Sequence, residues 1–225
     1  MKFHYIEHNR DVIDGIDVDE LSGLKITQSS KPRNGVVFHT LGEITVEGEP
    51  LHLGIKTAVD TAATKASDAD LLSRELPIAS VIASAAPEIT SLLPKVFGRI
   101  MLDGDTKPVG MLVEDSTQGG ELPIHTRTVS TEVQNIIEDA VCEPGREVID
   151  DFFGNGRLEV TMAYSVGGEE RILDFTPNPL RPKGYRRLGY KEHIDAVEQS
   201  LDELTIVVDP ATTLGRSLRN TRRPE

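Results

Sequence analysis

The chain has few aromatic residues, a single cysteine and no long apolar run. It contains no tryptophan, four tyrosines and six phenylalanines in 225 residues, so its core must be mostly aliphatic. Cys142 is alone, which excludes a disulfide within the chain and fits a reducing compartment. No stretch reaches the roughly 18 apolar residues of a membrane span, and the first residues lack an apolar signal core. We therefore expect a cytoplasmic protein without a membrane partner.

Basic residues are also scarce relative to acidic ones. With 24 basic and 37 acidic side chains, the formal net charge is −13, which argues against a nucleic-acid partner because such proteins need a basic face. A polyphosphate can still bind where a few lysines and a cation gather. The end of the chain, residues 209–225, is a basic tail. It contains four arginines: Arg216, Arg219, Arg222 and Arg223. We expect this tail either to be solvated or to use these arginines to anchor an acidic partner.

The first half of the chain has the pattern of a small sheet with a helix. Residues 1–20 are polar and form an expected N-terminal arm, either an edge strand or a loose segment. Apolar alternation and turn residues then predict five strands, at 24–27, 36–46, 51–56, 92–102 and 108–114. Between the third and fourth strands, Ser67 or Asp68 caps a helix that continues to Glu75 and is interrupted at Pro77. The prediction for residues 21–122 is an α+β lobe with a five-stranded antiparallel sheet and one helix.

The second half, residues 123–208, reads as a smaller and mainly helical lobe that contains one β-hairpin. Helical spacing of apolar residues predicts helices at 131–141 and 190–204. Alternation on either side of Gly167-Gly168 predicts a hairpin with strands at 158–164 and 171–175.

Lys56 is the first candidate for chemistry, because it ends a predicted interior strand beyond a flexible loop. A lysine in that place can contact nucleotide phosphates, although it can also be a solvent-facing residue of an alternating strand. Glu75 follows 19 residues later on the predicted helix and could hold Lys56 by ion pairing. Lys56 and Glu75 together, on a strand followed by a helix, indicate a phosphate-binding site more strongly than either residue alone.

The order of motifs resembles the N-lobe of the protein-kinase-like superfamily, and most closely the aminoglycoside and choline phosphotransferase branch. The resemblance covers about residues 24–122. After the strand with Lys56, the motifs that carry it are Arg74-Glu75, Leu93-Pro94-Lys95-Val96-Phe97-Gly98, Val109-Gly110-Met111-Leu112-Val113-Glu114-Asp115 and Gly120-Glu121-Leu122.

The resemblance implies a site for ATP and Mg²⁺. Lys56 would bind the α- and β-phosphates, and Glu75 would orient it. Residues 112–115, with Glu114, would form the hinge whose backbone pairs with adenine. Residues 29–35 would cover the phosphates with the help of Lys31 and Arg33, although the loop departs from the family by having one glycine, Gly35.

The second lobe offers the remaining residues that the family chemistry needs. Asp150 and Asn155 have the spacing of a catalytic aspartate and a metal-binding asparagine, and Asp174-Phe175 resembles the metal-binding step. Carboxylate and amide oxygens suit Mg²⁺. The family's histidine before the catalytic aspartate is missing, because Val148 and Ile149 stand there.

Three functions are therefore considered. The leading one is a phosphotransferase that uses ATP and Mg²⁺ on an unidentified acceptor. The departures from the family favour a second, a pseudokinase-like module that binds a nucleotide or a protein without transfer. The third is a structural or assembly protein, whose acidic body and basic tail would suit head-to-tail contacts.

Overall fold

A computed structural model describes residues 4–30, 36–58, 83, 90, 93, 95–115, 124–128, 159–164, 170–175 and 203–221. Side chains are described for these residues except 4–7, 124–128, 159–164 and 170–175. The chain divides into two compact units. The sheet unit comprises Glu7–Leu76, Lys95–Gly120 and Leu201–Glu225, and the second unit comprises Met1–Ile6, Pro77–Pro94 and Glu121–Ser200.

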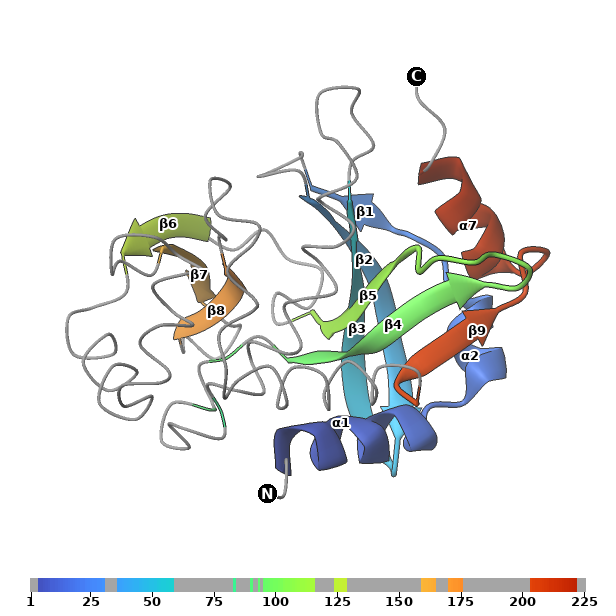
Figure 1. Cartoon of the computed structure of the whole chain (residues 1–225), viewed down its shortest axis with the longest axis horizontal. Helices are drawn as coiled ribbons and strands as arrows, with labels where there is room; N and C mark the ends of the chain where they lie inside the picture. Colours follow the sequence, from blue (N-terminus) through green and yellow to red (C-terminus); the bar gives the residue numbers. More distant parts are fainter. Residues whose placement is uncertain are drawn as a thin grey trace, which may run out of the picture. The chain divides into compact units, whose positions relative to one another are not determined.

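The sheet unit contains a six-stranded mixed sheet in the order β1-β2-β3-β5-β4-β9 (Figure 1). Its strands are β1 (Gln28–Ser29), β2 (Val36–Val46), β3 (Glu49–Ala58), β4 (Val96–Leu102), β5 (Gly110–Glu114) and β9 (Thr205–Val208). The first five pair antiparallel, whereas β9 pairs parallel to β4. The α+β character is confirmed, but the expectation of a purely antiparallel five-stranded sheet is wrong. The reason is that a strand from the end of the chain extends the sheet beyond β4.

The β2–β3 hairpin explains why the middle of the sheet could be read from the sequence. Buried and more exposed side chains alternate along part of β2, whereas residues 53–57 of β3 are all buried. The two strands are joined by Glu47 and Gly48, with Val46 opposite Glu49. The φ angles of Glu47 and Gly48 are 53° and 88°, the left-handed pair that defines a tight type I′ reversal. The strand expected at 24–27 is displaced, because its ladder forms at Gln28–Ser29. Leu24 and Ile26 instead pack against the core from an extended segment.

Three described helices belong wholly or mostly to the sheet unit, namely α1 (His4–Gly15), α2 (Val18–Gly23) and α7 (Thr213–Thr221). The expectation of an edge strand or loose arm at residues 1–20 is therefore wrong. Val12 and Ile13 of α1 pack against the core, and Ile16, directly after the helix, is buried in it. Asp17 caps α2 by accepting the backbone N–H groups of Asp19 and Glu20.

The C-terminal helix α7 corrects the expectation of a solvated tail. Leu214 and Leu218 are fully buried, whereas Arg216 and Arg219 are exposed. Asp209 and Thr212 start the helix, since their side chains accept the backbone N–H groups of Ala211 and Gly215. The basic residues therefore form the outer face of a packed helix. Arg222 and Arg223 lie outside the described residues.

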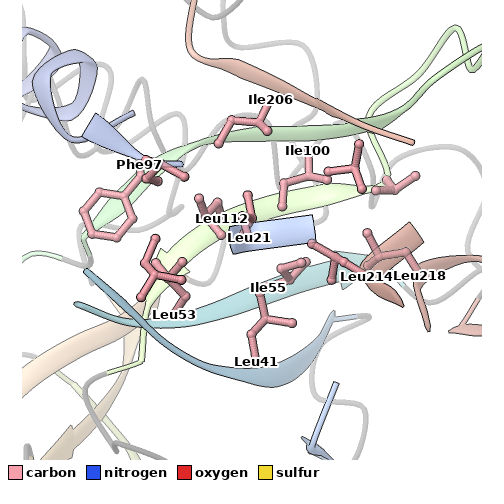
Figure 2. Packing of buried hydrophobic residues seen from close by; sticks show 14 of the residues in the cluster. Leu21, Leu41, Leu53, Ile55, Phe97, Ile100, Leu112, Ile206, Leu214 and Leu218 are labelled. Atoms are coloured by element: carbon pink, nitrogen blue, oxygen red, sulfur yellow. The ribbon is translucent and has the colours of Figure 1, made fainter. Parts of the chain in front are cut away.

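The core lies between one face of the sheet and the helices (Figure 2). Leu21 of α2 and Leu214 and Leu218 of α7 pack in one cluster with sheet residues. The sheet side of this cluster includes Leu41, Leu53, Ile55, Phe97, Ile100, Leu112 and Ile206. Burying aliphatic surface in this way supplies most of the favourable free energy of folding.

The second unit contains a three-stranded antiparallel sheet in the order β6-β7-β8, formed by β6 (Ile124–Thr128), β7 (Glu159–Tyr164) and β8 (Glu170–Phe175). The pairing of β7 with β8 confirms the predicted hairpin. The strand β6 was not predicted. The helices expected at 67–75 and 131–141 lie outside the described residues, as does the helix expected at 190–204 except for Glu203 and Leu204, which lie in a turn. Ala83 is helical and buried.

Candidate functional site

Lys56 occupies the middle of the sheet, on the face opposite the core. Its neighbours along β3, Leu53 and Ile55, belong to the core cluster, and side chains alternate along a strand. Phe38 of β2 and Met111 of β5 lie directly across from it. Lys56 is 5% exposed, which is unusual because a buried lysine must find charge or hydrogen-bonding compensation.

The residues directly across from Lys56 on the two neighbouring strands have apolar side chains. A side chain at Gly54, two residues before Lys56, would collide with the ring of Phe38, so the glycine allows that ring to lie against the strand. Phe38 is partly exposed, whereas Met111 and Val113 on β5 are buried. This face of the sheet therefore places a cation beside one accessible aromatic ring and two buried apolar side chains.

The end of β5, the predicted hinge, is held by bonds to both neighbouring strands. The N–H of Glu114 donates to the carbonyl of Lys95 at 2.9 Å, and the N–H of Asp115 donates to the carbonyl of His52 at 2.9 Å. The Glu114 carboxylate forms an ion pair with the Lys95 ammonium at 2.8 Å. The hinge backbone is thus firmly positioned, and the Glu114 side chain is engaged with Lys95. Asp115 is 2% exposed.

His39 lies on the core-side face of the sheet and connects three strands. Its Nδ1 lies 2.8 Å from the hydroxyl of Ser29 on β1, and its Nε2 lies 2.8 Å from the hydroxyl of Thr57 on β3. Burial lowers the pKa of the His39 imidazole to about 4, so the ring is neutral at pH 7.

Ser29 and His39 do not have the chemistry of a nucleophile and its base. General bases work best with a pKa near the operating pH, and a pKa of about 4 makes His39 a weak proton acceptor. His39 Nε2, the ring nitrogen that does not contact Ser29, contacts the hydroxyl of Thr57. In an activated histidine, the corresponding nitrogen contacts a carboxylate that orients the ring. The trio is therefore a hydrogen-bonded link between strands.

The other residues predicted for the site have different outcomes. Lys31, Arg33, Glu75, Asp150 and Asn155 lie outside the described residues. Asp174 lies on β8 opposite Thr161, and its backbone alone is described. Their proposed roles remain predictions.

Sequence reasoning did not identify two polar residues that organise the sheet unit. His39 was not singled out, although alternation with Leu41 could have placed it inward. Asn9 of α1 is buried and donates to the carbonyl of Val96 at 2.7 Å. Its place between helix-spaced apolar residues was the available signal.

No protein-family model, curated protein or solved structure matched this chain. Within the described ranges, no group of three or more His, Cys, Asp or Glu side chains could hold a metal ion. In the same part of the chain, every helix is too short or too polar to cross a membrane.

Proposed function

We propose that this protein is an ATP- and Mg²⁺-dependent phosphotransferase whose sheet unit binds the nucleotide. The observation that carries the proposal is the burial of Lys56 in the central strand pair β3–β5, on the sheet face opposite the core. Protein kinases contact the α- and β-phosphates with a lysine on the third strand of such a sheet. The kinase-like order of motifs in the sequence supports the same assignment.

The surroundings of Lys56 suit a nucleotide on physical grounds. An ammonium group shielded from water attracts phosphate more strongly than an exposed one, because the effective dielectric constant is lower. Phe38 is partly exposed and offers an aromatic face of the kind that commonly lines ligand sites, and buried Met111 lies on the other side of Lys56. The firmly held end of β5 would present backbone carbonyls to the base.

The remaining roles follow the resemblance. Lys31 and Arg33 would face the phosphates, Glu75 would orient Lys56, and the backbone at Glu114 would contact adenine. Asp174 and Asn155 would hold Mg²⁺, whose chemistry is to neutralise charge on the transferring phosphoryl group. Asp150 would accept the proton of the acceptor hydroxyl.

Calorimetric titration with ATP and Mg²⁺ tests the proposal directly. We expect the wild-type protein to bind, and Lys56→Met to bind at least about tenfold more weakly because a charge-assisted contact is lost. Lys107→Met is the matched control, since Lys107 is exposed on the β4–β5 connection and should not affect binding. Far-UV circular dichroism confirms that each variant is folded. Absence of wild-type binding, or equal binding by Lys56→Met, would remove the proposal.

Formation of ADP separates transfer from binding alone. A phosphotransferase should release ADP from ATP slowly even when water is the acceptor, and Asp174→Asn should abolish this release. A protein that binds ATP through Lys56 and forms no ADP would instead be the non-catalytic binding module.

A further inference from the structure

One row of side chains crosses the sheet on the face that carries Lys56. The ladder places its members directly opposite one another, on β2, β3, β5, β4 and β9 in turn: Phe38, Lys56, Met111, Arg99 and Thr205. Their neighbours along the strands, Ile55, Leu112 and Ile100, belong to the core, so alternation places the row on the opposite face. The row therefore contains two cations, Lys56 and Arg99, with Met111 between them.

The spacing of Lys56 and Arg99 suits a ligand with several negative charges. One strand, β5, separates their strands, so the two Cα atoms lie about 10 Å apart, twice the distance between neighbouring strands. Both side chains are long, and Met111 between them is an uncharged residue that is 2% exposed. A phosphate chain that lies over Met111 can therefore contact both cations.

The strand positions around the two cations carry no charge of their own. Two residues away from Lys56 or Arg99, the strands have these residues: Gly54 and Ala58 on β3, and Phe97 and Met101 on β4. The chain as a whole has a formal net charge of −13. This face of the sheet thus holds a local pair of cations in an acidic protein, which favours an anionic ligand at this point.

Arg99 has the exposure and the donors that a phosphate contact needs. It is partly exposed, whereas Lys56 is buried, so a ligand can reach Arg99 from solvent. Its Nε donates to the Thr205 hydroxyl at 3.2 Å, which holds the guanidinium group beside β9. A guanidinium group has five N–H donors and binds phosphate oxygens in pairs, so Arg99 can keep this bond and also contact a phosphate.

We propose that Arg99 binds the terminal phosphate of ATP and thereby makes the site prefer ATP over ADP. This inference rests on the proposed function, which assigns the α- and β-phosphates to Lys56. A phosphate chain that continues from Lys56 across Met111 brings its third phosphate to Arg99. ADP lacks that phosphate and would not make this charge-assisted contact.

Calorimetric titration with ATP and with ADP, each with Mg²⁺, tests the role of Arg99. For Arg99→Met we expect about tenfold weaker binding of ATP and unchanged binding of ADP, because only ATP loses a charge-assisted contact. Lys56→Met should weaken both nucleotides. Arg219→Met is the matched control, since it removes the same charge from an exposed position on α7, which packs on the core side of the sheet. It should leave both affinities as in the wild type.

Two further variants separate the phosphate contact from the link between β4 and β9. Arg99→Lys keeps the charge but not the paired donors, so its affinity for ATP should fall between those of the wild type and Arg99→Met. Thr205→Val removes the bond to Arg99 but leaves the guanidinium group, so the preference for ATP should persist. Far-UV circular dichroism melts show whether each variant is folded at the temperature of the titration.

The outcomes separate the two proposals. If the wild type binds neither nucleotide, the proposed function fails and Arg99 has no phosphate to bind. If the wild type binds ATP through Lys56 and folded Arg99→Met binds ATP equally well, the role of Arg99 alone is overturned. Equal weakening of ATP and ADP by Arg99→Met would also overturn it, because the effect would then not depend on the terminal phosphate.

Discussion

Within the part of the chain that the structure describes, Glu47 is the one non-glycine residue with a positive φ angle. It has a φ of 53° in the two-residue turn between β2 and β3, a region that costs an ordinary L-residue about 1–2 kcal/mol and that asparagine enters readily. We predict that Glu47→Asn raises the free energy of unfolding by about 1 kcal/mol, measured by urea denaturation. Glu49→Asn, two residues further in extended β3, should give no gain. Unchanged or lower stability of Glu47→Asn would show that the turn has a different conformation.

At the scale of elements, the dependence of α1 on one side chain can be tested. The β4 ladder shifts between Val96 and Gly98, which leaves Phe97 as an extra residue, and at this bulge the Val96 carbonyl accepts from the Asn9 side chain. We predict that Asn9→Ala lowers the free energy of unfolding by about 2 kcal/mol, because the buried bond that the Asn9 side chain donates to the Val96 carbonyl is lost. Denaturant unfolding should show little effect of Asp14→Ala, an exposed position on the same helix. A cost for Asn9→Ala no larger than that of Asp14→Ala would mean that the bond does not stabilise α1.

The same scale shows which elements the sequence could predict. Strands β2, β3, β4 and β5 follow from alternation and from turns at Glu47-Gly48 and Asp103-Gly104, which act over a few residues. Strand β9 could not be predicted in this way. Its four residues pair with β4 across more than 100 residues of chain, as Arg99 opposite Thr205 shows, and no local pattern encodes that distance. Helix α1 was missed because few of its residues are apolar and its anchor, Asn9, is polar.

The candidate site shows the same division between local and distant information. Lys56 could be singled out from its strand, and the structure adds that it is buried between Phe38 and Met111. The role of His39 depends on Ser29 and Thr57, which lie 10 and 18 residues away on two other strands. Cross-strand register decides which of these side chains meet, and a one-residue slip would separate them.

At the scale of the whole molecule, the sheet unit is assembled from three separate stretches of chain. Its last stretch supplies both the edge strand β9 and the helix α7. Five of its apolar side chains are buried: Leu204, Ile206, Val208, Leu214 and Leu218. Burying one such side chain contributes about 1.5–3 kcal/mol, so the set is comparable to the 5–15 kcal/mol that stabilises a typical domain. We therefore expect that the first two stretches alone do not reach the stable form of the sheet unit.

We accordingly predict that a chain ending at residue 200 lacks cooperative thermal unfolding of the sheet unit, and that a peptide of residues 201–225 restores it in trans. Because the protein has no tryptophan, the measurements are far-UV circular dichroism melts and amide NMR spectra rather than fluorescence. A peptide with Leu214→Asp and Leu218→Asp should not restore folding, since it would place carboxylates in the core at positions that are fully buried. The shortened chain could instead unfold cooperatively by itself, at a temperature close to that of the full chain. This result would show that the sheet is already stable without β9 and α7. Rescue by the native peptide alone would show that they complete it.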